Sequence, residues 1–313
     1  MLTFVARRLF FSIPTLLAVM TLIFILVRIV PGDPAQTILG DEASAAALDA
    51  MRERLGLNRP LLEQYLDFMG SALTGDWGVS MVSGRSILGE VANVLPYTIE
   101  LTVVSLIFGV VTGIPLGVWS ALHRNRLIDY LIRVTSLIGL SFPAFVSAIM
   151  LLIVFSINLG WFPVISAGNR GDLLGWFRDL ALPALTLGLI MAAFITRVTR
   201  SSMLGVLSED YIRTARAKGV PHNVIIWRHA MRNALIPVVT VVGLYLGILI
   251  GNSVLTEIVF NRPGLGKLIV GALGQRDYTM LQGLMVVFAF IILFVNLLTD
   301  LTYGLIDPRV KYQ

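Results

Sequence analysis

The stretch that decides the fold lies near the N-terminus and reads LFFSIPTLLAVMTLIFILVRIV, from Leu9 to Val30. At 1.5 Å of rise per residue, an apolar helix of this length spans about 30 Å, the thickness of a bilayer's hydrocarbon core. Arg7 and Arg8 precede it, and Pro31-Gly32-Asp33-Pro34 ends it. A signal peptide has a shorter apolar core of about 7–15 residues and a small-residue cleavage site. We therefore expect a retained membrane-spanning helix.

Five further stretches have similar length and character, at about Thr98–Leu122, Val134–Leu159, Leu182–Val198, Leu235–Glu257 and Leu284–Ile306. Pro143 lies inside the second of these, and glycines such as Gly113 and Gly117 recur in the first. Such residues weaken helices in water but allow kinks or close helix packing in a membrane. The sequence therefore predicts an all-α polytopic membrane protein with six transmembrane helices.

The composition of the 313-residue chain supports a membrane protein and excludes several other classes. Hydrophobic residues make up 56% and charged residues 14%, and the mean hydropathy is +0.83. Soluble domains are typically about 25% charged, so an ordinary cytosolic enzyme is excluded. The chain has no cysteine, which excludes thiolate zinc sites, iron–sulfur clusters and thiol catalysis.

The distribution of charge predicts the orientation. With the N-terminus inside, the inner segments 1–8, 122–133, 197–235 and 307–313 hold 14 Lys and Arg against 4 Asp and Glu. The outer segments 31–97, 158–182 and 258–282 hold 9 against 12. Because cytoplasmic loops carry the excess of Lys and Arg, we expect both termini in the cytoplasm.

Two connecting segments are too long to be simple loops. The outer loop 31–97 has helical signals over Ala43–Leu55 and again after Asn58-Arg59-Pro60. We therefore divide the chain into 1–97, the first transmembrane helix with a long outer loop, and 98–313, the remaining transmembrane domain.

The inner segment 197–235 predicts a helix–turn–helix. Ser208 is suited to cap a first helix whose first turn carries Glu209 and Asp210. Gly219 is a natural stop for that helix, and Pro221 suits the first turn of a second.

Nothing in the sequence indicates catalysis or a metal site. The three histidines, His123, His222 and His229, do not form a His-Glu-x-x-His pair. The segment Pro263–Lys267 resembles a phosphate loop, but Asn261 and Leu268 stand where the motif requires a glycine and a hydroxyl.

Ionisable residues within membrane spans are costly, and they mark ion pathways by default. Glu100, Glu257 and Asp300, together with Arg28, are the candidates. All four are near helix ends, where charge costs less, so a structural role is favoured over a proton relay.

The basic inner segment has three interpretations. A DNA-binding helix needs freedom to enter a groove, and tethering at both ends to membrane spans disfavours this. Attraction to anionic lipid suits Arg197 and Arg200. Docking of a soluble partner is favoured by Tyr211, Ile212, Ala215 and Trp227, which place apolar groups at helical spacing.

The same segment resembles a known family. Asp210–Gly219, reading DYIRTARAKG, and His229–Pro237, reading HAMRNALIP, look like the signature loop of binding-protein-dependent ABC importer permeases. Ala215 matches the second alanine of the general Glu-Ala-Ala pattern, whereas Arg213 and Thr214 replace the other two, as in dipeptide and oligopeptide permeases.

Other segments extend the resemblance along the chain and identify the first permease subunit type: Leu55-Gly56-Leu57, Gly75-Asp76-Trp77-Gly78, Glu257–Phe260, Pro263–Gly266 and Arg276-Asp277-Tyr278. The resemblance implies import of peptides across the bacterial inner membrane. It implies four kinds of partner: a homologous second permease, two cytoplasmic ATPases, an external solute-binding protein and membrane lipid, with no nucleic acid.

The resemblance also implies the site residues. The ATPases would bind ATP and Mg, with no cofactor in this chain. ATPase coupling falls on the inner helix: Tyr211, Ile212, Arg213, Thr214, Ala215, Arg216, Ala217, Lys218 and Gly219. In the outer loop, Pro263, Gly264, Arg276 and Asp277 are candidates for an outer gate or for docking of the binding protein.

The substrate and the transport class stay open at this point. Glutathione, nickel complexes, sugars and opines are alternatives to dipeptides and oligopeptides. A standalone proton-coupled carrier using Glu257 and Asp300, and a structural membrane scaffold, are the alternatives from other classes.

Overall fold

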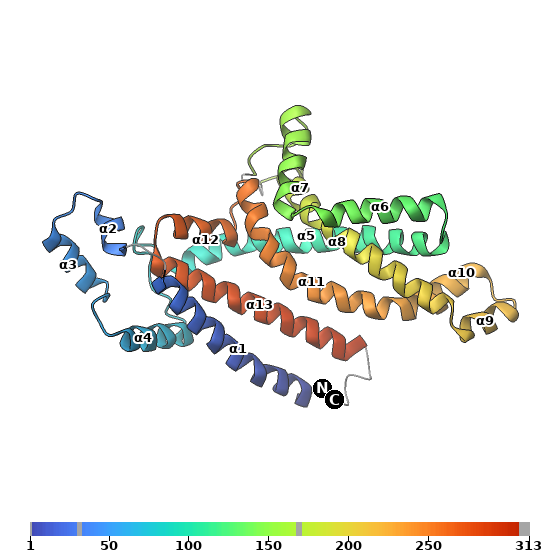
Figure 1. Cartoon of the computed structure of the whole chain (residues 1–313), viewed down its shortest axis with the longest axis horizontal. Helices are drawn as coiled ribbons and strands as arrows, with labels where there is room; N and C mark the ends of the chain where they lie inside the picture. Colours follow the sequence, from blue (N-terminus) through green and yellow to red (C-terminus); the bar gives the residue numbers. More distant parts are fainter. Residues whose placement is uncertain (1, 30–32, 167–170, 307–313) are drawn as a thin grey trace. The chain divides into compact units, whose positions relative to one another are not determined.

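The computed structural model describes residues 2–29, 33–166 and 171–306 (Figure 1). Within these ranges the chain is helical and has no strand, apart from an isolated bridge between Val79 and Ser86. The elements are α1 (Leu2–Ile29), α2 (Pro34–Leu39), α3 (Ala45–Arg54), α4 (Leu61–Thr74), α5 (Ile87–Leu122), α6 (Leu127–Ser141), α7 (Ala144–Leu151), the π-helix η1 (Leu152–Asn158), α8 (Leu173–Leu207), α9 (Asp210–Ala217), α10 (His222–Val224), the π-helix η2 (Ile225–Ala230), α11 (Met231–Val259), α12 (Leu265–Gly274) and α13 (Tyr278–Ile306).

The helices confirm the predicted all-α membrane fold. Within the described residues, five helical segments are long and apolar enough to cross a membrane: Phe10–Ile29, Ile87–Leu122, Leu173–Leu207, His222–Val259 and Tyr278–Leu301. They correspond to five of the six predicted spans, with bounds that differ at the ends; Val30, the predicted end of the first span, lies outside the described residues. The helical signals in the outer loop are also confirmed, because α3 and α4 occupy the two predicted stretches.

The third predicted span, Val134–Leu159, is wrong as a continuous helix. The chain forms α6, then bends by 104° before α7 and η1. Pro143 caps the start of α7, and Phe142 before it is extended, with φ −98° and ψ 134°. Proline disfavours the helical conformation in the residue that precedes it, so α6 ends at Ser141. The two pieces count as a sixth span only if they are taken together.

The chain divides into two compact units, and α5 and α13 run through both. The N-terminal unit comprises Leu2–Tyr97 and Pro263–Phe294. Its core gathers buried side chains from α1, α4, α12 and α13, including Met20, Ile23, Ala72, Leu265, Ala272, Leu281 and Leu284.

The central unit comprises Thr98–Arg262 and the segment from Val295 onward. Leu187, Met191 and Ile195 of α8 lie at its core, between Leu101 of α5 and the α11 residues Val238 and Leu249. The helix α8 thus forms the buried axis of this unit. Its 35 residues extend about 50 Å at 1.5 Å per residue, which exceeds the bilayer's hydrocarbon thickness.

Glycines bring α5 into backbone contact with α8, as expected for small residues at a membrane helix interface. A Cβ atom at Gly113 would lie 2.8 Å from the carbonyl oxygen of Ala192. A Cβ at Gly117 would lie 2.7 Å from the carbonyl oxygen of Thr196. The Thr196 hydroxyl donates across the interface to the Gly113 carbonyl at 3.2 Å. The two helices therefore pack at a distance that no side chain at these positions permits.

We expect Gly113→Val to force α5 away from α8 and to destabilise the protein by about 1–3 kcal/mol, the usual cost of overpacking a well-packed core. The matched control is Gly205→Val, because Gly205 is also helical but has open space around its Cβ position. Thermal denaturation in detergent measures the difference. Equal melting of both variants would contradict the close approach of the two helices.

Candidate functional site

The predicted inner helix is α9, and it ends at a left-handed glycine. Gly219 has φ +73°. Its N–H donates to the Arg216 carbonyl at 3.0 Å, and the Val220 N–H donates to the Ala215 carbonyl at 3.2 Å. These two bonds make a Schellman motif, which satisfies carbonyl groups at the helix end. The predicted glycine stop is therefore confirmed, and it fixes the direction in which the chain leaves α9.

The start of α9 differs from the prediction for Ser208. Because α8 continues to Leu207, Ser208 is the C-cap of α8, and its hydroxyl donates to the Gly205 carbonyl at 2.7 Å. Glu209 occupies the cap position of α9 but makes no side-chain cap bond. Asp210 does lie in the first turn, as predicted, where it favours the positive end of the helix.

The helix α9 has two unlike faces. Ile212 is fully buried and packs with Met203, Ile225 and Ile226, and half-buried Ala215 packs against the same cluster. The opposite face is exposed and carries Tyr211, Arg213, Thr214, Arg216, Ala217 and Lys218. Ile212 and Ala215 therefore hold α9 to its own protein, and the surface offered to a partner is mainly basic.

Tyr211 ties α9 to the start of α11. The side-chain amide of Asn233 donates to the Tyr211 hydroxyl at 2.8 Å. Trp227, in η2, is 59% exposed beside this short helical region. Because Ile212 also packs against Met203 of α8, α9 is attached to both α8 and α11.

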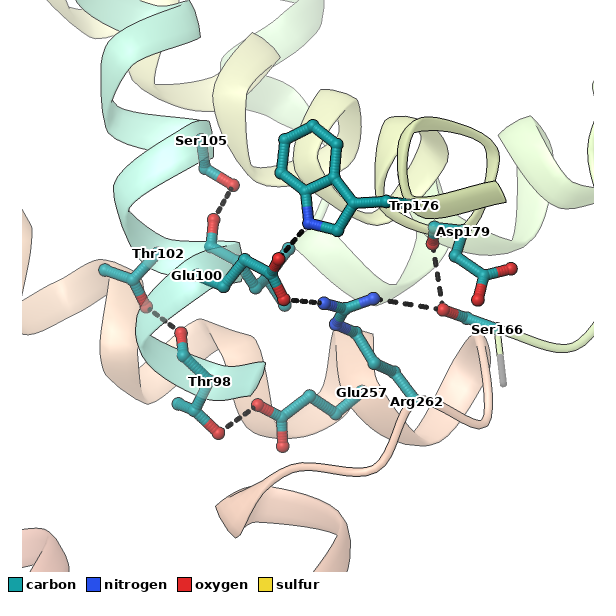
Figure 2. A network of polar contacts seen from close by, with 10 residues as sticks. Thr98, Glu100, Thr102, Ser105, Ser166, Trp176, Asp179, Glu257 and Arg262 are labelled. Atoms are coloured by element: carbon teal, nitrogen blue, oxygen red, sulfur yellow. Dashed lines mark hydrogen bonds and ion pairs between the residues drawn. The ribbon is translucent and has the colours of Figure 1, made fainter. Parts of the chain in front are cut away.

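A buried polar cluster lies at the other end of the same helices, and Figure 2 shows it. Arg262, only 1% exposed, donates through Nη2 to the Glu100 carboxylate at 2.6 Å and through Nη1 to the Ser166 hydroxyl at 3.2 Å. The Trp176 indole N–H donates to the other oxygen of Glu100. The cluster therefore links three parts of the central unit. Glu100 belongs to α5, Trp176 lies near the start of α8, and Arg262 stands in the segment that follows α11.

Glu257 is also engaged. It is fully buried in α11, and its carboxylate accepts a hydrogen bond from the Thr98 hydroxyl at 2.6 Å (Figure 2). Asp300 belongs to α13 and lies beside a different part of α11, because its neighbour Thr299 donates to the Gly243 carbonyl at 3.1 Å. Gly243 and Glu257 are about 21 Å apart along the helix axis. Glu257 and Asp300 therefore do not form a direct proton relay, and the structural interpretation of Glu257 is favoured.

Asp129 forms a second buried ion pair at the α9 end of α8. Its side chain is 1% exposed and accepts two bonds from Arg200, at 2.7 and 2.8 Å. The Ser120 hydroxyl donates to the same carboxylate at 2.6 Å. The pair joins α5, α6 and α8.

The four predicted outer-loop residues differ in their exposure and in their contacts. Asp277 is buried and accepts bonds from the Ser80 hydroxyl and from the Met280 N–H, the latter at 3.0 Å. Gly264 is also buried, and it starts α12 with Pro263 half-buried before it. The segment Pro263–Gly266 is thus partly helical, because α12 begins at Leu265. Of the four residues, Arg276 alone is exposed, and Asp277 serves the N-terminal unit's own structure.

The central unit thus has a basic, exposed helix, α9, at one end and a buried, hydrogen-bonded polar cluster at the other. Comparison with known proteins decides the family. Residues 113–312 match the model of the binding-protein-dependent transport system inner membrane component, and residues 1–102 match the model of its N-terminal part. The chain is a permease of the binding-protein-dependent ABC importer family.

Full-length relatives agree with this assignment. The permease is 42% identical over 313 residues, covering all of both chains, to the glutathione transport system permease protein GsiC of Escherichia coli K12. The same values hold for GsiC of Shigella dysenteriae serotype 1. The resemblance to the ABC importer permease family is thereby confirmed.

Solved structures support the fold. The permease aligns with the MetNI methionine ABC transporter in an inward-facing conformation, with a TM-score of 0.56 at 19% identity, over 71% of this chain and 98% of that one. An amino acid ABC transporter gives a TM-score of 0.53 at 13% identity, over 69% and 94%.

Two functional-site features were missed by the sequence analysis, namely the partners of Glu100 and the burial of Asp129. In the sequence, Arg262 lies in the connecting segment 258–282 and Asp129 in the short basic segment 122–133. Single charged residues in such segments are ordinarily solvated, so neither residue was expected to be buried. Within the described ranges, no group of three or more His, Asp or Glu side chains is placed to hold a metal ion.

Proposed function

We propose that this permease imports short peptides, with glutathione, itself a tripeptide, as the first candidate. The observation that carries the proposal is the 42% identity over the full length to permeases named for glutathione transport. The peptide-type form of the signature loop, with Arg213 and Thr214 before Ala215, supports the same substrate class.

The permease would work as a heterodimer with a homologous second permease, together with two cytoplasmic ATPases and an external solute-binding protein. ATP and Mg would be bound by the ATPases, so hydrolysis is not an activity of this chain. The segment Tyr211–Gly219 would couple hydrolysis to transport. The exposed basic face of α9 supports this role, because exposed Arg216 and Lys218 can meet acidic groups of a partner. Arg213 is exposed beside them and pairs with exposed Asp210 at 3.2 Å.

The orientation proposed from the charge count places both termini and α9 on the cytoplasmic side of a bacterial inner membrane. Residues 1–97 would supply the first transmembrane helix with the long periplasmic loop, and residues 98–313 the permease domain. Docking of the binding protein or outer gating would then fall to the outer loops. Arg276 is the exposed candidate there, with Pro263, Gly264 and Asp277 shaping the loop that presents it.

Single cysteines test the orientation, because the natural chain has none. We expect Ser71→Cys to react with a membrane-impermeant thiol reagent in intact cells and Ser208→Cys to react only after the cells are opened. Both side chains are exposed, so burial does not protect either one. Labelling of Ser208→Cys in sealed cells would reverse the proposed orientation.

Uptake into vesicles tests the substrate class. The complete importer, with its ATPases and binding protein, is offered labelled glutathione with unlabelled dipeptides, longer peptides or a nickel complex as competitors. We expect ATP-dependent uptake that only peptides compete for. Competition by the nickel complex alone, or uptake by this chain alone under a proton gradient, would contradict the proposal.

A further inference from the structure

A basic cavity of about 370 Å³ opens between α5, α6 and α8 in the central unit. This volume is within the range of about 300–1,000 Å³ that is typical of small-ligand sites. Arg133 of α6 and the α8 residues Arg197 and Arg200 line it. Guanidinium groups gathered around one cavity favour an anionic ligand where their charge is not balanced by an acidic side chain of the protein.

The charges in the cavity are only partly balanced within the protein. Arg200 is held by Asp129 through two hydrogen bonds, so its position is fixed and its charge is neutralised. Arg133 and Arg197 make no hydrogen bond or ion pair with the residues that the structure describes, and both are exposed. Two positive charges therefore remain for a ligand, beside a third arginine that is already oriented.

Hydroxyl donors lie next to these arginines. Ser136 of α6 and Ser201 of α8 line the same cavity. Phosphate oxygens accept several charge-assisted and neutral hydrogen bonds at once, and arginine with hydroxyl groups is the usual donor set for them.

Part of the cavity wall is apolar. Leu137 and Leu140 of α6 line it, about one and two helical turns along from Arg133, and Leu137 is 54% exposed. A basic end joined to a leucine wall matches a molecule with a phosphate head and a hydrocarbon chain. A free phosphate ion would gain nothing from the leucines, and a peptide would not need them beside three arginines.

We propose that this cavity binds an anionic phospholipid, with the phosphodiester between Arg133 and Arg197 and the first part of an acyl chain along Leu137 and Leu140. The charge count places the cavity on the cytoplasmic side, where basic pockets between transmembrane helices bind such head groups. Bound lipid would contact both α6 and α8. It would thereby stabilise the end of α8 that leads into α9.

The test compares two double variants of the assembled importer in bilayer discs of phosphatidylglycerol and phosphatidylcholine. Arg133→Gln with Arg197→Gln removes the two unpaired cavity charges. Arg124→Gln with Arg126→Gln is the matched control, because it removes two exposed arginines from the same inner segment outside the cavity. Phosphatidylglycerol that stays bound after detergent extraction is counted by mass spectrometry.

We expect the cavity variant to retain less phosphatidylglycerol than the control by about tenfold or more, as expected for two lost arginine contacts. Equal retention in both variants would overturn the proposal. Displacement of the lipid by millimolar inorganic phosphate would identify a free-anion site instead, and displacement by glutathione a solute site, and either result overturns the lipid assignment. If the double variant does not assemble, Arg133→Gln alone applies the same test, because Arg133 makes no hydrogen bond or ion pair with the part of the chain that the structure describes.

Discussion

Replacing Arg262 with leucine should destabilise the permease by about 3–5 kcal/mol, the cost of removing one partner from a buried ion pair. Arg262 is 1% exposed, and its guanidinium lies between the Glu100 carboxylate and the Ser166 hydroxyl. The variant removes the arginine partner of the Glu100 carboxylate, whose side chain is only 17% exposed. Thermal denaturation of the purified permease in detergent measures the loss.

Two comparisons isolate the ion pair from other effects. Arg178→Leu removes an exposed arginine of α8 in the same unit and should change the melting temperature little. Glu100→Gln combined with Arg262→Gln removes both charges and should cost less than Arg262→Leu, because no buried charge is left unpaired. The assigned role of the cluster is wrong if Arg262→Leu melts like Arg178→Leu.

Replacing Gly219 with valine should uncouple ATP hydrolysis from transport. Gly219 has φ +73°, and nothing lies within 4 Å of its Cβ position. A Cβ atom therefore meets no clash, and the expected effect comes from the left-handed backbone, which costs a β-branched residue about 1–3 kcal/mol. That strain breaks the Schellman motif and redirects the end of α9. Because moving α9 relieves this strain, we expect uptake by the reconstituted importer to fall by about tenfold or more.

Asparagine at the same position is the matched control. It adds a Cβ in the same open space, but it tolerates the left-handed region far better than valine. Gly219→Asn should keep most of the uptake and the solute-stimulated ATPase activity, whereas Gly219→Val should lose both or hydrolyse ATP without moving solute. Equal behaviour of the two variants would show that the backbone conformation at Gly219 does not matter for coupling.

The spans were predictable because the bilayer demands about 20 apolar residues, a signal that a single sequence carries. The glycine stop of α9 was predictable for a similar reason, since a left-handed turn favours one residue type. The bend at Phe142–Pro143 was not predicted. Proline inside an apolar run is compatible with a kinked helix or a broken one, and the sequence does not distinguish them.

The polar clusters were beyond sequence reasoning because their members are far apart in the chain. Glu100 and Arg262 are separated by 162 residues, and Asp129 and Arg200 by 71. The sequence pattern also did not show which face of α9 is exposed and which is buried. Ile212 and Ala215 have the spacing of a docking face, but the same spacing serves the protein's own core, to which the structure assigns them.

Crosslinking from α9 tests the central claim, that its exposed basic face contacts an ATPase. A photo-crosslinker is attached to a single cysteine introduced at Arg216, which is possible because the chain has none of its own. Illumination of the assembled importer should join this chain to an ATPase subunit, whereas the same group at Ser71 should not. If Arg216→Cys gives no ATPase crosslink in an importer that hydrolyses ATP and transports normally, α9 is not the coupling element.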